Sequence, residues 1–182
     1  ELYASADHVS QLFGADSGSN ASPLHAERSE RLVTMLDRLN EVTRKQYDAA
    51  AAAFRGAEPE EPATQLEALA NERHTALFAE LKSYMLATEW PGNRLASDVA
   101  TMATNLEIVG DRACFVADVV ASQDDSPAGV VAERVEDIFE AGRTVNDLMG
   151  SVVFEADPAR YEDIRSEEET IHRDLNELFE LV

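Results

Sequence analysis

The chain has 182 residues, of which 45% are hydrophobic, so it is long enough to bury a core and is not composed like a disordered segment. It carries 36 acidic and 15 basic residues, and such a surface is not expected to bind nucleic acid directly, because phosphate neutralisation needs clustered Lys and Arg. No apolar run approaches the about 20 residues that a bilayer span needs.

The N-terminal region predicts a short helix and a linker. Leu2, Val9 and Leu12 recur at helical spacing within residues 1–13. Residues 14–23 are rich in Gly, Ser, Asn and Asp, a composition typical of flexible connections. We therefore separate residues 1–25 from the helices that follow.

Three long helices are predicted next, over residues 26–54, 63–87 and 95–121. Each range carries apolar residues at steps of three and four. Arg55-Gly56 and the acidic loop before Pro62 end the first helix, and Pro91-Gly92-Asn93 separates the second from the third. The apolar stripe of the third helix is Val99, Met102, Leu106, Val109, Ala113, Val116 and Val120.

Two further helices are predicted over residues 129–154 and 157–182. The second begins at Asp157-Pro158, an N-cap residue followed by a proline at the first helical position. Strand-like alternation is absent from the sequence. The predicted fold class is therefore all-α, built of antiparallel helical bundles with short loops, with one unit over residues 26–122 and another over 123–182.

The third helix contains the run Asn105-Leu106-Glu107-Ile108-Val109-Gly110-Asp111-Arg112-Ala113. This run resembles the third-helix signature of PhoU domains, the accessory regulators of phosphate uptake. The resemblance implies a complete three-helix bundle over residues 26–121 and the first two helices of a second copy over 129–182. Either the chain is part of a longer tandem array, or the N-terminal helix, which keeps Asp7-His8 of the signature, completes the second bundle.

Five residues are predicted to bind metal. Glu107 and Asp111 lie one turn apart, so both carboxylates leave one face of the helix. The resemblance implies multinuclear iron or zinc there, and carboxylate oxygens can share or bridge a metal. Glu72 is the contribution expected from the second helix, and Glu168 with His172 that from the last. The alternative is a solvated acidic face in a protein that is acidic everywhere.

Three side chains have expectations about their surroundings. Glu168 occupies a slot in an otherwise apolar stripe, so its carboxylate should be paired, metal-bound or protonated. His74 falls on an apolar stripe and is expected at the core or its boundary. Cys114, the only cysteine, is expected on the outer strip with Glu107 and Asp111; as a lone cysteine it forms no intrachain disulfide and favours a reducing cytoplasm.

The sequence does not favour an enzyme. A di-metal carboxylate bundle needs two Glu-x-x-His motifs, and only Glu169–His172 has that form. There is no Gly-rich phosphate loop and no nucleophile with a Ser/His/Asp context.

The resemblance implies a non-enzymatic cytoplasmic adaptor that contacts a phosphate transporter's ATPase or a sensor kinase at the membrane face, without inserting into the membrane. A homodimer is expected, because an incomplete second bundle leaves an apolar face uncovered. The first alternative is the regulatory region of a larger transporter, channel regulator or transcription factor, since the first residue is Glu1 rather than Met. A di-metal carboxylate bundle enzyme is the second.

The acidic composition also indicates the environment. Only Lys45 and Lys82 are lysines, and the formal net charge is −21, a balance typical of proteins from salt-loving microbes. At molar salt the Debye length is about 3 Å, which screens the repulsion between surface carboxylates. At low salt the same repulsion should destabilise the fold. Most of the acidic residues are therefore assigned to solvation.

Overall fold

The structure is a computed structural model that describes residues 23–87, 92–122, 129–154 and 157–181. Within these ranges the regular structure is entirely helical, which confirms the predicted all-α class. The helices are α2 (Pro23–Phe54), α3 (Ala63–Ala87), α4 (Gly92–Ala121), α5 (Val130–Phe154) and α6 (Tyr161–Leu181), with a short 3-10 helix, η2 (Pro158–Arg160), before α6. The helix and linker predicted for residues 1–22 lie outside the described residues.

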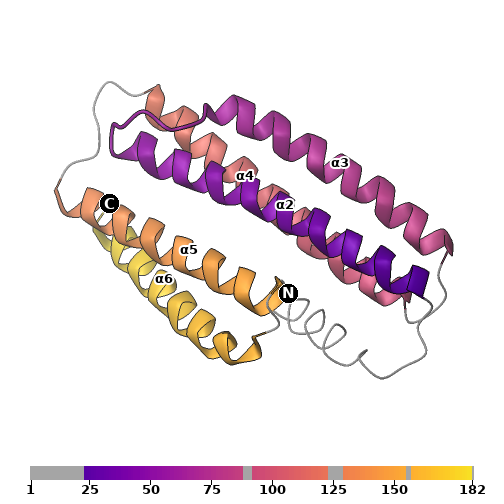
Figure 1. Ribbon diagram of the computed structural model, residues 1–182. Helices are drawn as coiled ribbons and strands as arrows, with labels where there is room; N and C mark the ends of the chain where they lie inside the picture. Colours follow the sequence, from indigo (N-terminus) through magenta and orange to yellow (C-terminus); the bar gives the residue numbers. More distant parts are fainter. Residues whose placement is uncertain (1–22, 88–91, 123–128, 155–156, 182) are drawn as a thin grey trace.

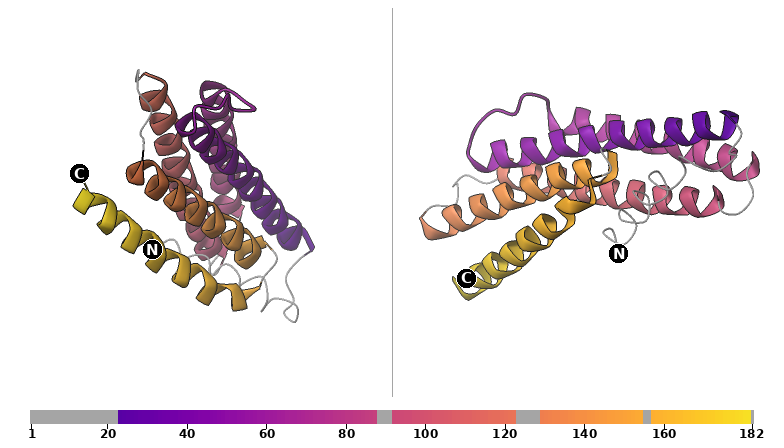
Figure 2. Two further views of the ribbon diagram at one scale, coloured as in Figure 1. Left: turned by 90° about the vertical axis from the view of Figure 1, so that its left-hand side faces the viewer. Right: turned by 60° about the horizontal axis from the view of Figure 1, so that its bottom comes forward.

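The helix α2 is the centre of the arrangement. It packs against α3, α4 and α5, and α3 and α4 also pack against each other. The helix α5 lies between α2 and α6, so the α5–α6 hairpin docks on the other helices through α5 (Figures 1 and 2). Whether residues 26–122 and 123–182 form tandem bundles of the PhoU kind stays a prediction.

The end of α2 follows the predicted signal. Gly56 has a φ of 68°, a left-handed conformation that glycine adopts at no steric cost. Its N–H donates to the Ala53 carbonyl, and the Ala57 N–H donates to the Ala52 carbonyl, both at 2.9 Å. These two bonds form a Schellman motif, which satisfies the last carbonyls of the helix and stops it.

The start of the last helix is also close to the prediction. The Asp157 Oδ1 accepts a hydrogen bond from the Ala159 N–H at 3.2 Å, as an N-cap carboxylate does. The first turn is a 3-10 turn, and the α-helix begins at Tyr161. Two starts are earlier than predicted: α2 begins at Pro23, since a proline lacks only an N–H that the first turn leaves unpaired, and α4 includes Gly92.

The core is centred on α2 and is shared by all the described α-helices. Leu32, Leu36 and Leu39 of α2 are fully buried, and each such side chain contributes about 2 kcal/mol by leaving water. The same cluster includes leucines of α3, Val99 and Met102 of α4, and extends through α5 to α6. The α5–α6 hairpin therefore has no separate core among the described residues.

Two glycines let neighbouring helices approach α2 closely. At Gly110 of α4, a Cβ would overlap the side-chain amide of Gln46. At Gly142 of α5, a Cβ would overlap the hydroxyl of Tyr47, which donates to the Ile138 carbonyl at 3.5 Å. The Tyr47 ring also meets Phe139 edge-on at a centroid distance of 5.3 Å. Close packing of α2 against α4 and α5 thus depends on the absence of these two side chains.

The two glycines of α5 make a matched test of this packing. Gly150 lies two turns after Gly142, and a Cβ there would meet only the Asn40 amide nitrogen at 3.9 Å, an ordinary contact. Both changes to alanine gain the same helix propensity of about 1 kcal/mol. We expect Gly150→Ala to raise the free energy of unfolding by about that amount. Gly142→Ala should lower it by about 1 kcal/mol, because the overlap with Tyr47 outweighs the gain. Urea unfolding followed by circular dichroism measures both, and equal stabilisation by the two changes would contradict the packing described here.

Candidate functional site: the motif face of α4

The motif on α4 divides into a packing side and an outward side. Leu106 and Ala113 are half-buried and buried, and Gly110 is buried against α2. The Thr43 hydroxyl of α2 contacts the carbonyls of Leu39 and Leu106, each at 3.2 Å, and donates to them. The leucine, glycine and alanine of the motif therefore serve the α2–α4 contact.

Gln46 is the buried polar group at this contact. Its side chain is fully buried, and its Nε2 donates to the Cys114 Sγ at 3.3 Å. Its Oε1 has no hydrogen-bond partner among the described residues, and it is the atom nearest to the position that a Gly110 Cβ would take. The carbonyl of the amide is therefore directed at the backbone of α4, where a Cα–H can serve as a weak donor.

Cys114 corrects one prediction, because it lies inside the α2–α4 contact rather than on the outer strip. It is 4% exposed, and its thiol donates to the Ala63 carbonyl at 3.6 Å. Burial raises the pKa of the Cys114 thiol, the bond from Gln46 lowers it, and the charges of nearby carboxylates raise it. Such a thiol is a poor metal ligand and a poor nucleophile.

Val109 corrects a second prediction. The sequence places Val109 in the buried apolar stripe, whereas in the structure it is 42% exposed. Because an α-helix has 3.6 residues per turn, the row that meets α2 passes from Met102 and Leu106 to Gly110, Cys114 and Ala117. The stripe of larger apolar residues runs along one side of that row.

Glu107 and Asp111 lie outside this row, as predicted. Glu107 is half-buried and Asp111 is exposed. The charges of Glu67, Asp111 and Asp118 contribute to raising the pKa of the Cys114 thiol. Glu72, predicted as the α3 ligand, is exposed.

Glu168 and His172 lie on α6. This helix packs on α5, which packs on α2, and α2 in turn packs on α4, the helix that carries the motif. The Glu168 Oε1 is 3.8 Å from the His172 Nε2, and their side chains are 41% and 72% exposed. Glu168 is half-buried and lies within ion-pairing distance of His172, which is one of the states expected for a carboxylate in that apolar stripe. The buried carboxylate of α6 is Asp174, at 3% exposed, which accepts a hydrogen bond from the Arg173 Nε at 3.1 Å. Asp174 does not fall on the apolar stripe of α6, so the sequence does not predict its burial.

The five predicted metal ligands do not come together in one place. They are distributed over α3, α4 and α6, as two pairs and a single residue. Within the described ranges, no three His, Cys, Asp or Glu side chains lie close enough to hold a metal ion. Each pair therefore offers two ligands from one helix, and a complete metal site would need more.

His74 lies where the sequence predicted, at the boundary of the core. It is half-buried, and its ring lies 4.5 Å from that of Phe78. Its Nε2 has no hydrogen-bond partner among the described residues. Among the described residues, His74 belongs to no group of three potential metal ligands.

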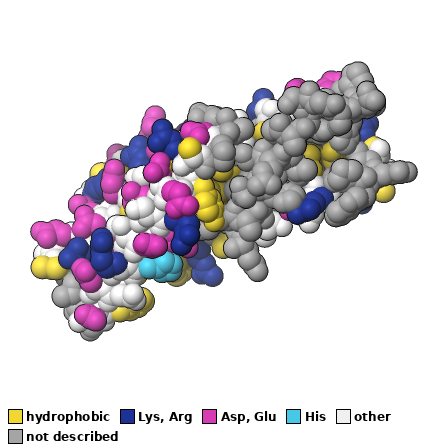
Figure 3. All heavy atoms as spheres, turned by 90° about the horizontal axis from the view of Figure 1, so that it is seen from below, with side chains coloured by type: hydrophobic (Ala, Val, Ile, Leu, Met, Phe, Trp, Pro, Cys, Tyr) yellow, Lys and Arg dark blue, Asp and Glu magenta, His cyan; other side chains and the backbone are white. Residues whose placement is uncertain are grey.

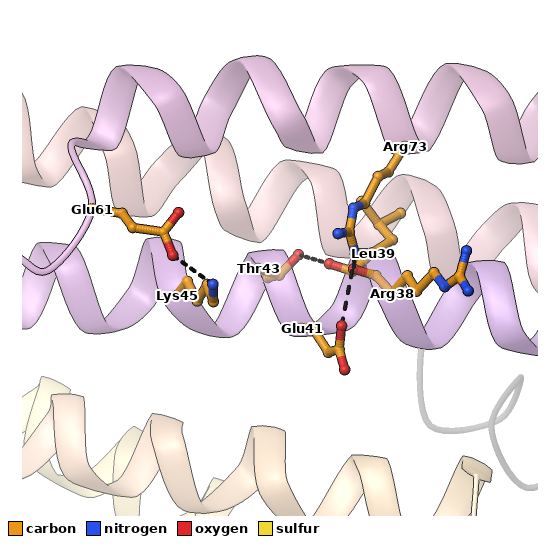
Figure 4. A network of polar contacts seen from close by, with 7 residues as sticks. All are labelled: Arg38, Leu39, Glu41, Thr43, Lys45, Glu61 and Arg73. Atoms are coloured by element: carbon orange, nitrogen blue, oxygen red, sulfur yellow. Dashed lines mark hydrogen bonds and ion pairs between the residues drawn. The ribbon is translucent and has the colours of Figure 1, made fainter.

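Ion pairs link neighbouring helices at their outer edges. Lys45 of α2 pairs with Glu61 of the acidic loop, and Arg73 of α3 reaches back to Glu41 of α2 (Figure 4). The hydrogen bond and charge of Glu61 raise the pKa of Lys45. Three more ion pairs join α2 to α5: Arg44–Asp147, Arg55–Glu136 and Arg143–Asp48. On the described part of the face in Figure 3, acidic and basic side chains are interspersed. Each exposed ion pair contributes less than about 1 kcal/mol.

Comparison of the chain with models of protein families, with curated proteins and with solved structures finds no match in any of the three. The class that the described structure defines is an all-α helical-bundle protein. In the described part of the chain, no helix combines the length and apolarity needed to cross a bilayer.

Metal content tests the predicted ligands directly. We expect protein purified in molar salt to retain iron or zinc, and the double variant Glu107→Ala/Asp111→Ala to lose most of it, measured by elemental mass spectrometry. Glu58→Ala/Glu60→Ala, which removes two exposed carboxylates of the acidic loop, is the control for non-specific binding. Equal metal content in all three proteins would assign Glu107 and Asp111 to solvation.

Proposed function

We propose that the chain is a PhoU-like, non-enzymatic regulator of phosphate uptake or phosphate signalling. It acts as an adaptor that docks on a phosphate transporter's ATPase or on a sensor kinase at the cytoplasmic face of the membrane. The observation that carries the proposal is the division of the α4 motif. Its leucine, glycine and alanine pack against α2, while Glu107 and Asp111 lie outside that row.

The outward side of α4 also carries apolar side chains that suit a docking surface. Ile108 and Phe115 are 48% and 62% exposed, and they lie seven residues apart, on one side of the helix. Exposed apolar residues next to charged ones are typical of protein–protein contact sites. We call Ile108, Phe115 and the adjacent Asp111 the α4 docking face.

The proposed metal ions would organise this surface or an oligomer. Glu107 and Asp111 on one bundle, with carboxylates from another helix or another copy, could bridge iron or zinc. A homodimer would supply those further ligands. It would also cover the α5–α6 hairpin, where Val131, Ile138 and Leu175 are only half-buried.

A regulatory region of a larger chain is the second candidate. It is favoured by the same half-buried residues of α5 and α6, which a further helix of a longer protein would cover as well as a second copy would. The docking chemistry of α4 would be the same in both cases.

Phosphate uptake in the organism that carries the gene tests the proposal. We expect deletion of the gene to change the rate of labelled phosphate uptake in phosphate-rich medium, and the wild-type gene to restore it. The variant Ile108→Ser/Phe115→Ser should fold but fail to restore the rate, because it removes the apolar part of the docking face. Leu86→Ser, at another exposed apolar position of 81% exposure, is the matched control and should restore it. An uptake rate that deletion leaves unchanged would contradict the proposal.

A further inference from the structure

A cavity of about 250 Å³ lies between α2, α4 and α5. Its walls include Asn40 and Tyr47 of α2, Met102 of α4, and Asn146, Met149 and Gly150 of α5. It lies beside the close approach of Tyr47 and Gly142. The helices α2 and α5 are therefore in close contact at Tyr47 and Gly142 and are separated by the cavity beside that contact.

The lining of the cavity differs from the rest of the surface. All thirteen lining residues are uncharged, in a chain of which 28% of the residues are charged. Most are apolar, and the polar ones are two amides, a threonine and a tyrosine. The Thr43 hydroxyl is already engaged by carbonyls of α2 and α4. An uncharged ligand would therefore be preferred over an ion.

Asn40 supplies the polar feature that points to a ligand. Its side chain is 5% exposed. Its amide nitrogen is the nearest atom to the position of a Gly150 Cβ, at 3.9 Å, so it is directed across the cavity toward α5. A ligand with a hydrogen-bonding group in the cavity could pair with this amide. Asn146 lies on the opposite wall.

We propose that this cavity is a binding site for a small uncharged molecule with an apolar body and one hydrogen-bonding group, of the class of an alkylphenol. An apolar cavity of about 150 Å³ accommodates benzene, so the larger cavity here suits a substituted aromatic ring. The apolar body contacts Met102 and Met149, and the hydroxyl pairs with the Asn40 amide. Because the ligand touches α2, α4 and α5 together, its binding stabilises the docking of the hairpin on α2. The site is independent of the proposed role in phosphate regulation.

The four methionines of the chain provide the assay. Met102 and Met149 line the cavity, whereas Met35 packs against the main core and Met85 is 47% exposed on α3. With ¹³C-methyl-labelled methionine, 4-ethylphenol should shift the resonances of Met102 and Met149 saturably and leave the other two unchanged. Ethylbenzene, which lacks the hydroxyl, should bind about tenfold more weakly. The charged 4-ethylbenzoate should produce no saturable shift.

Two variants separate a binding site from a packing void. Gly150→Leu fills the cavity and should abolish the shifts while keeping the melting temperature at or above that of the wild type. Asn40→Leu keeps the apolar walls and should make 4-ethylphenol and ethylbenzene bind equally. The proposal is overturned if 4-ethylphenol fails to shift Met102 and Met149 in the wild type, as a water-filled or collapsed void would. It is equally overturned if binding survives unchanged in Gly150→Leu, or if the wild type does not prefer 4-ethylphenol.

Discussion

The contact between Gln46 of α2 and Gly110 of α4 is the constraint on which the other packing depends. A fully buried amide fits against a helix backbone only where that helix has no side chain, and Gly110 provides that place. The Thr43 hydroxyl and the Cys114 thiol hold the same two helices together on either side. Because α3 and α5 also pack on α2, the position of α2 against α4 determines where the other helices can lie.

The same constraint relates the structure to the proposed function. Packing requirements occupy Leu106, Gly110 and Ala113, so only the remaining positions of the motif are free to meet a metal or a partner. On α5, Gly142 allows contact with Tyr47 while Gly150, two turns later, borders the cavity. Beside the close approach of α2 and α5 lies a cavity with an uncharged lining, in a protein whose net charge is −21.

The sequence predicts helix ends and caps well, and it predicts contacts between helices poorly. The end of α2 at Gly56 and the Asp157 cap depend on residues adjacent in the chain, and both were predicted. Which side of α4 meets α2 depends on small residues whose periodicity is weaker than that of the valines, so Cys114 was misplaced. The burial of Asp174 and Asn40 depends on distant helices, and no spacing rule indicates it. Whether Glu107 and Asp111 bind metal depends on ligands that their own helix does not provide.

A double-mutant cycle on Gln46 and Gly110 tests the central packing claim most directly. In the wild-type background, Gly110→Ala should lower the free energy of unfolding by about 1–2 kcal/mol, because the new Cβ would overlap the fully buried Gln46 amide and force it to shift. In the Gln46→Ala background the same change should be stabilising by about 0.5–1 kcal/mol, since only the gain in helix propensity remains. Equal effects of Gly110→Ala in the two backgrounds would show that the two residues are not coupled and would contradict the account.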